Sequence, residues 1–213
     1  MNNLTKKEKT RRLAESALLI ALATILAEFT VFEFPFGGSV TLFSQLPIVI
    51  LSYRYGVKWG LVTGFTMSLL QMVFGAANFS YVSGITSYLI LAFADYIVAF
   101  TALGLGGMFK NAVKNQAVAL GLGGAVTSFI RYACHIISGV TIWKEYAGDT
   151  PVWEYSVTYN GGYMIPELII TVIGAVIIGS IFDFSGNEIK VLRKKNKNKP
   201  ENELKKTKKV KKM

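Results

Sequence analysis

Residues 131–160 read RYACHIISGVTIWKEYAGDTPVWEYSVTYN, and this stretch joins an apolar segment to a loop rich in polar and aromatic side chains. An arginine, the only histidine of the chain and a glycine stand four residues apart, at Arg131, His135 and Gly139. Residues at this spacing lie on one face of a helix, one turn apart, and Trp143 continues the same stripe. The chain returns from the loop through Tyr155, Tyr159 and Asn160. We expect these groups to line a pocket for a small, polar aromatic molecule.

The composition of the chain around this stretch is typical of an integral membrane protein. Hydrophobic residues make up 52% of the 213 residues, and the mean hydropathy is +0.41, whereas soluble domains usually contain about 45–50% apolar residues. The apolar residues come in long runs, and a helix needs about 20 of them to cross a bilayer. We therefore predict an all-α integral membrane domain over residues 13–183, a bundle of six transmembrane helices. The expected helices cover residues 13–34, 42–53, 57–75, 85–109, 117–143 and 156–182.

The basic residues are distributed as in a multi-pass membrane protein, although the net charge of +10 alone would suggest a nucleic-acid partner. Of the 23 Lys and Arg residues, five lie in a leader at residues 1–12 and twelve in a lysine-rich tail at residues 184–213. Two further pairs fall in alternate connections: Arg54 with Lys58, and Lys110 with Lys114. The positive-inside rule places all of these on the cytoplasmic side. We predict that both termini are cytoplasmic, that the basic ends face lipid head groups, and that no nucleic acid is bound.

One acidic residue lies deep in an expected membrane helix. Asp95 is the only acid between Glu33 and Glu145, and a carboxylate at bilayer depth costs roughly 2.5–3.5 kcal/mol on insertion scales. Such a residue needs a partner or a task, and Arg131 is the obvious candidate partner. The residues leave two interpretations open: a structural Asp95–Arg131 pair, or a site that uses the carboxylate for a cationic ligand. Glu167, which follows a proline, is a second candidate for a buried acid.

Several classes of function lack the residues that they require. One histidine and one cysteine, Cys134, do not suffice for a metal site or an internal disulfide. The chain has no G-x-x-x-x-G-K-[ST] phosphate loop for ATP, and no nucleophile–base pair indicates a catalytic site. Ala17 and Ala21 form a small-xxx-small strip on the first helix, a pattern that lets helices approach closely. From the residues alone, internal packing is the favoured interpretation of that strip.

Five segments of the chain together resemble one family. They are RYACHIISG at 131–139 with TPVWEYSVTYN at 150–160, YMIP at 163–166, DYIVAF at 95–100, and PFGGSVT at 35–41. These motifs are similar to those of the thiamine-specific S-component, the substrate-binding membrane subunit of bacterial energy-coupling factor (ECF) vitamin transporters. The resemblance covers roughly residues 13–183.

The resemblance implies a transporter subunit and not an enzyme. The chain would capture thiamine at the outer face of the bacterial cell membrane, and a coupling membrane subunit with two ATPase subunits would supply the energy, so that the chain itself needs no cofactor. His135 and Trp143 would sandwich a ring of the vitamin, and many members carry glutamate where this chain has Asp95. Ala17 and Ala21 match a strip that faces the coupling subunit, which reverses the preference for internal packing. The implied substrate-binding residues are Asp95, Tyr96, Arg131, His135, Gly139, Trp143, Tyr155 and Asn160.

Two alternatives remain open. The first is an S-component for a thiamine precursor or another vitamin, which the aspartate at position 95 keeps in consideration. The second, from a different class, is a small membrane enzyme or structural membrane protein that uses Asp95 and His135 for proton chemistry.

Overall fold

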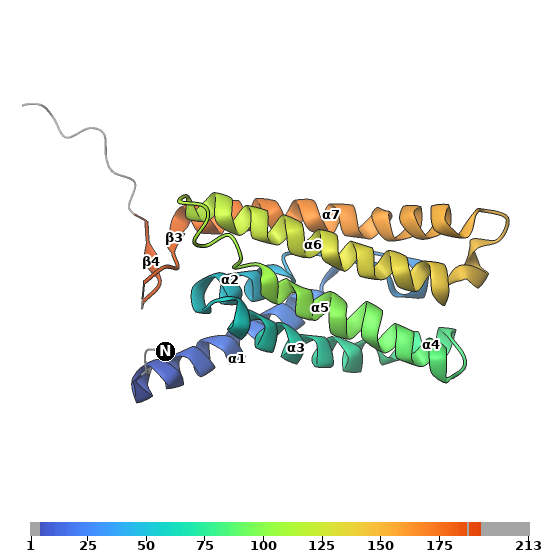
Figure 1. Ribbon diagram of the computed structural model, residues 1–213, viewed down its shortest axis with the longest axis horizontal. Helices are drawn as coiled ribbons and strands as arrows, with labels where there is room; N and C mark the ends of the chain where they lie inside the picture. Colours follow the sequence, from blue (N-terminus) through green and yellow to red (C-terminus); the bar gives the residue numbers. More distant parts are fainter. Residues whose placement is uncertain (1–4, 187, 193–213) are drawn as a thin grey trace, which may run out of the picture.

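A computed structural model describes residues 5–186 and 188–192 of the chain. The helices run along one common direction and form an elongated bundle (Figure 1). The first four residues of the predicted leader and residues 193–213 of the predicted tail lie outside the described residues. The long helices are α1 (Lys6–Glu28), α2 (Leu46–Tyr55), α3 (Val57–Phe74), a composite fourth helix over Ile85–Leu105, α6 (Gln116–Thr141) and α7 (Val152–Ile181). The short elements are β1 (Thr30–Glu33), η1 (Pro35–Gly37), β2 (Ser39–Thr41), η2 (Ala76–Tyr81), η5 (Lys144–Ala147), β3 (Phe182–Asp183) and β4 (Lys190–Val191).

The first helix differs at both ends from the expected span of residues 13–34. It begins at Lys6 because Thr5 caps it: the Thr5 hydroxyl accepts from the Glu8 backbone N–H at 3.3 Å, and the Glu8 carboxylate accepts from the Thr5 N–H at 2.9 Å. This reciprocal capping box satisfies two donors that a helix start leaves unpaired. The helix ends at Glu28, because the β-branched and aromatic residues that follow form β1, which pairs antiparallel with β2.

The second helix begins four residues later than expected. Phe43 takes a left-handed conformation with a φ of 62°, so the helix cannot start at residue 42. The first turn of α2 contains Pro47. Proline suits this position because it lacks an N–H, and the N–H groups of a first helical turn have no partner within the helix. The helix ends at Tyr55, and Gly56, with a φ of 90°, allows the tight turn into α3.

The fourth helix is continuous from Ile85 to Leu105 but changes type along its length. An α-helical start, α4 (Ile85–Ile90), is followed by a π-helix, η3 (Leu91–Val98), by α5 (Ala99–Thr101) and by a 3-10 turn, η4 (Ala102–Leu105). The helix therefore ends four residues before the expected residue 109. Asp95 and Tyr96 both lie in the π-helical part, and π-helical turns are frequent at functional sites.

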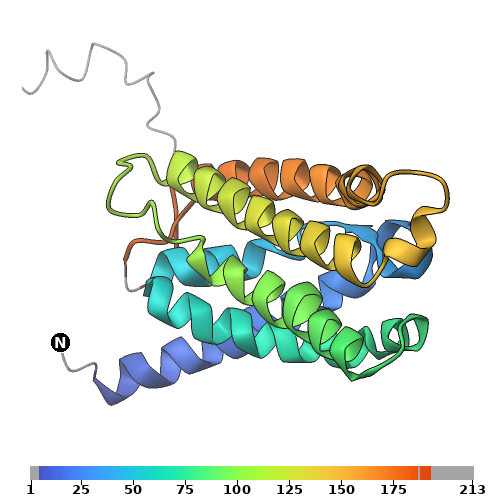
Figure 2. The same ribbon diagram turned by 45° about the vertical axis from the view of Figure 1, so that its right-hand side comes forward.

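The last two helices, α6 and α7, form a long antiparallel pair on one side of the bundle (Figure 2). Asn115 caps α6, since its side chain accepts from the Val118 N–H at 3.2 Å. Helix α7 begins directly after Pro151, four residues before the expected start at residue 156. Because α6 already ends at Thr141, Trp143 lies just outside the helix, at the start of the connection to α7.

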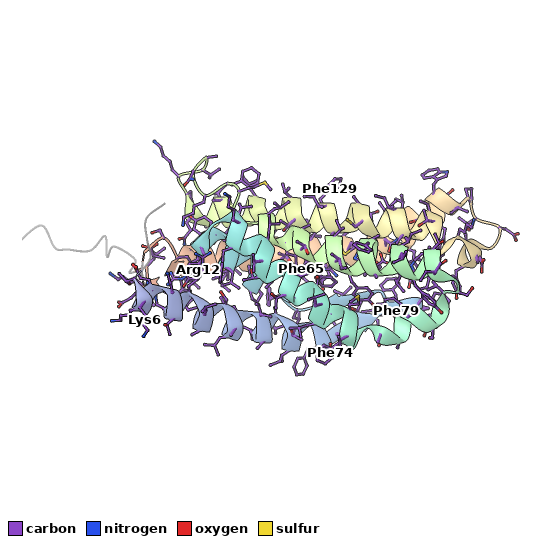
Figure 3. The ribbon with its side chains drawn as sticks, turned by 60° about the horizontal axis from the view of Figure 1, so that its bottom comes forward. Lys6, Arg12, Phe65, Phe74, Phe79 and Phe129 are labelled. Carbon is purple, nitrogen blue, oxygen red and sulfur yellow. The ribbon has the colours of Figure 1, made fainter. Side chains whose placement is uncertain are left out.

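The surface of the bundle is apolar. Phe65 and Phe74 on α3 and Phe129 on α6 are exposed on the surface (Figure 3), with exposed fractions of 44%, 58% and 62%. Among the described helices, four are long and apolar enough to cross a membrane: Val57–Phe74, Ile85–Leu105, Gln116–Thr141 and Val152–Ile181. Helix α1 contains too many charged residues to count as apolar enough, and α2, with only 10 residues, is too short. The structure is therefore that of a membrane protein, and the count of six transmembrane helices stays a prediction.

Both described ends of the chain lie at the same end of the bundle (Figure 1). Arg54, at the end of α2, is hydrogen-bonded to residues near both of these ends. Its Nε donates to Glu15 of α1 at 2.6 Å, and one terminal nitrogen donates to the Gly186 carbonyl at 3.0 Å. The Arg54 side chain is 2% exposed and that of Glu15 is 23% exposed, so the guanidinium is shielded from water and the carboxylate is partly shielded. The start of α1 is thereby fixed to the segment that follows α7.

Candidate functional site

A cavity of about 310 Å³ lies between α6, α7, the π-helical segment η3 and the β1–β2 hairpin. Its volume is at the lower end of the range of about 300–1,000 Å³ that is usual for small-molecule sites. All eight residues that the sequence predicts for the site are in its lining. They are Asp95, Tyr96, Arg131, His135, Gly139, Trp143, Tyr155 and Asn160. The fold thus gathers side chains from four parts of the chain around one space.

Asp95 is held against α6 by three donors. Nδ1 of His135 lies 2.9 Å from Oδ1, the hydroxyl of Ser138 donates to the same oxygen, and the indole N–H of Trp143 donates to Oδ2 at 3.3 Å. His135 and Ser138 are three residues apart on α6 and therefore share one face. The carboxylate is placed on one wall of the cavity, in contact with both the imidazole and the indole.

Arg131 does not form the ion pair with Asp95 that was one of the two interpretations left open. Among the described residues, the ionic partner of Asp95 within 4.0 Å is His135. The reason is position along α6: His135 and Ser138 stand level with the short aspartate side chain, whereas Arg131 is one turn nearer the start of the helix. Its guanidinium lies instead over the ring of Phe100, 4.2 Å from the centroid. The Nε of Arg131 is buried and has no hydrogen-bond partner within the described part of the chain.

The hydroxyl of Tyr96 is engaged inside the protein. It donates to the Gly75 carbonyl at 2.9 Å and accepts from Nδ2 of Asn78 at 2.9 Å. A side chain at position 75 would collide with this hydroxyl, so the glycine permits the close approach. The ring stacks on Phe79, with the centroids 6.0 Å apart. Tyr96 thus ties η2 to the π-helical segment and forms part of the cavity wall.

Asn160 connects α7 to the same face of α6. Its Nδ2 donates to the His135 carbonyl at 3.1 Å and to the Ser156 carbonyl at 2.8 Å, and its Oδ1 accepts from the Tyr163 hydroxyl at 2.5 Å. Gly139 makes this approach of the two helices possible, because a Cβ at that position would collide with Ser156 Oγ. The amide of Asn160 is therefore oriented by contacts on both helices.

Aromatic side chains pack around Phe36 and Trp143, which both line the cavity. Phe36 of η1 packs on Tyr146 at a centroid distance of 4.1 Å, with Tyr81 at 5.6 Å and Trp143 at 6.4 Å. The Tyr146 hydroxyl donates to the Tyr81 carbonyl at 3.0 Å. Tyr155 belongs to a separate stack on α7, 5.6 Å from Tyr159. Sequence reasoning missed Phe36, since a Pro-Phe-Gly-Gly pattern indicates a turn and not which way the phenylalanine points.

Two further polar residues line the cavity. Glu167 is 3% exposed, which confirms the expected second buried acid, and it accepts from Thr41 and from Gln45 Nε2, the latter at 2.7 Å. Ser138 was absent from the sequence-based set, although its spacing of three residues from His135 would have placed it on the same face. Both residues are in contact with groups from distant parts of the chain.

The arrangement suits a small, flat cation that also carries hydrogen-bonding groups. A carboxylate next to aromatic faces compensates a positive charge, and the rings attract it through their π-systems. Over residues 5–186 and 188–192, no group of three or more His, Cys, Asp and Glu side chains is placed to hold a metal ion.

Comparison with known proteins gives consistent matches. Residues 13–183 match the model of a family described as "Thiamine transporter protein (Thia_YuaJ)". The chain is 36% identical over 182 residues to "Thiamine transporter ThiT" of Bacillus subtilis (strain 168), which covers 80% of this chain and 91% of that protein. It is 29% identical over 142 residues to "Thiamine transporter ThiT" of Lacticaseibacillus paracasei, covering 62% and 68% of the two chains.

A solved structure of ThiT from Listeria monocytogenes shares the fold. Its TM-score is 0.66 with 20% sequence identity, and the match covers 80% of this chain and 94% of that chain.

Proposed function

This chain belongs to the family of ThiT thiamine transporters, and on this basis we propose that it is the thiamine-binding subunit of an ATP-driven ECF transporter in the bacterial cell membrane. The family is one of transport proteins, so the alternative of a small membrane enzyme is set aside. Thiamine combines a thiazolium ring, which carries a permanent positive charge, with a flat aminopyrimidine. The chain binds this molecule and passes it to a separate module that hydrolyses ATP.

The observation that carries the proposal is the position of Asp95 on the cavity wall, in contact with both His135 and Trp143. The thiazolium ring lies between the imidazole and the indole, where cation–π attraction contributes about 2 kcal/mol once water is removed. The carboxylate compensates the charge of the ring. No charged residue besides Asp95 is needed in contact with the thiazolium ring.

The remaining lining residues serve the polar groups of the vitamin. Asn160 and Tyr155 on α7, with Arg131 on α6, face the donors and acceptors of the pyrimidine ring and the hydroxyethyl group. Such groups cost about 1–3 kcal/mol each if they are buried without a partner. Tyr96 shapes the wall, and Gly139 leaves room between the two helices.

The proposed topology has six membrane helices over residues 13–183, with the basic leader at 1–12 and the lysine-rich tail at 184–213 in the cytoplasm. Both described ends lie at one end of the bundle, together with Arg54 and Lys110 (Figure 1). Basic residues on one side agree with the positive-inside rule. The cavity, which is lined by the η2 loop and by Trp143, then lies toward the outer face.

The proposed partners are a coupling membrane subunit and two ATPase subunits. Ala17 and Ala21 are exposed on α1, whereas Ser16, Ala23 and Thr24 of the same helix are buried. A strip of small residues allows a second helix to approach closely in lipid. This surface supports the assignment of the strip to the coupling subunit.

An uptake assay tests the proposal. We expect cells without their own thiamine transporter to accumulate labelled thiamine when they produce this chain together with a coupling subunit and both ATPase subunits. The same cells should take up none when any of these subunits is absent. Uptake by the chain alone would contradict dependence on the ECF module.

A further inference from the structure

Glu167 is a second buried carboxylate at the cavity, and the proposed contacts with thiamine do not use it. It accepts from the backbone N–H and the hydroxyl of Thr41, and from Gln45 Nε2 at 2.7 Å. Gln45 in turn accepts from Ser128 of α6 at 3.0 Å through its Oε1. Hydrogen bonds from several neutral donors stabilise the charged form of a carboxylate. The network therefore holds a negative charge at a defined place beside the cavity.

Arg131 is the positive charge on which this carboxylate acts. Both side chains line the same cavity, and Arg131 stands three residues after Ser128, the residue of α6 that the Glu167 network reaches through Gln45. Within the described part of the chain the two groups form no direct ion pair, so the attraction acts through space. Such attraction is stronger inside a protein than in water because the surroundings screen it less.

Asp95 has no permanently charged partner among the residues that it contacts. Its oxygens contact His135, Ser138 and Trp143, none of which is a permanent cation. Glu28 and Glu33 also line the cavity, but both are exposed, and salt and water screen them. With Arg131 set against Glu167, the buried part of the cavity carries one uncompensated negative charge.

We propose that Glu167 is a positioning residue that neutralises Arg131, so that Asp95 remains available for one positive charge and the site selects ligands with a single cationic centre. This inference rests on the proposed binding of thiamine and adds the basis of its selectivity. Without Glu167, the charge of Arg131 would repel the thiazolium ring. Arg131 keeps its hydrogen-bonding role only because its charge is cancelled nearby.

The test compares two ligands on the purified full chain at pH 8, where an ordinary imidazole is neutral. The ligands are thiamine and its isostere with a carbon in place of the charged ring nitrogen. The ratio of their affinities measures the preference for a cation. Glu167→Gln, which keeps the shape of the side chain, should lower that ratio by about tenfold or more. Glu154→Gln, an exposed position on the same helix outside the cavity lining, should leave the ratio unchanged.

Two more variants test whether Glu167 neutralises Arg131, even if Glu167→Gln folds poorly. Arg131→Gln leaves Glu167 uncompensated, so the ratio should rise although thiamine itself binds less tightly. The double variant should return the ratio to the wild-type value, since it again leaves one negative charge. If the role of Glu167 were purely structural, Glu167→Gln would lower the affinities for both ligands equally.

The outcomes separate this inference from the proposed function. If the wild-type chain binds neither ligand, the proposed function is wrong. If the wild-type chain prefers thiamine and the ratio does not move in Glu167→Gln or in Arg131→Gln, the inference about Glu167 is overturned and the proposed function stands.

Discussion

Replacement of Asp95 by asparagine is expected to lower the affinity for thiamine by about 100-fold, which corresponds to about 2.8 kcal/mol. The substitution removes the negative charge that faces the thiazolium ring. It also replaces one carboxylate oxygen with an NH₂ group, so that a donor of His135, Ser138 or Trp143 loses its acceptor. Hydrogen bonds to a charged group are worth about 1.5–3 kcal/mol. Isothermal titration calorimetry on the detergent-purified variant measures the loss.

The control for this variant is Asp149→Asn, an exposed acid in the connection between α6 and α7 that does not line the cavity. It should bind thiamine like the wild type. Size-exclusion chromatography shows whether Asp95→Asn is folded. A folded variant with unchanged affinity would contradict the role of the carboxylate, and an aggregated variant would favour a purely structural Asp95.

Ala17→Trp is expected to abolish thiamine uptake by the complete transporter while the affinity of the isolated chain stays within about twofold. Ala17 is exposed on α1 and is not part of the cavity lining, so an indole there alters only the outer surface. Close helix contacts in lipid depend on small residues, and a large side chain keeps the partner helix away. Uptake of labelled thiamine and calorimetry on the same variant measure the two effects.

Val62→Trp on α3 provides the matched control, because Val62 is also exposed, at 53%, on a membrane helix. It should support uptake like the wild type. Normal uptake with Ala17→Trp, or equal loss with both tryptophan variants, would show that the strip at Ala17 and Ala21 is not the docking surface.

The site wall on α6 was predictable because it depends on local geometry. Arg131, His135 and Gly139 repeat every four residues, and helical periodicity alone places them on one face. The structure brings all three to the cavity lining. The start of α1 was equally readable, since Thr5 and Glu8 have the spacing of a capping box. It was missed because residues 1–12 were assigned to a charged leader that precedes the first apolar run.

The partner of Asp95 was not predictable in the same way. It depends on the rotation of the fourth helix about its axis, and the π-helical turn that sets this rotation has no clear mark in the sequence. The contact of Glu167 with Thr41 joins residues 126 positions apart. Contacts of that kind follow from how the helices pack, and no local pattern of one sequence contains them.

The most direct test of the account is a tryptophan fluorescence titration of the purified chain with thiamine. Of the three tryptophans, only Trp143 lines the cavity. The wild-type chain should show strong, saturable quenching, because the cationic ring stacks on that indole, and Trp143→Phe should lose most of it. If a folded wild-type chain gives no change, or if Trp143→Phe is quenched to the same extent, thiamine does not bind in this cavity.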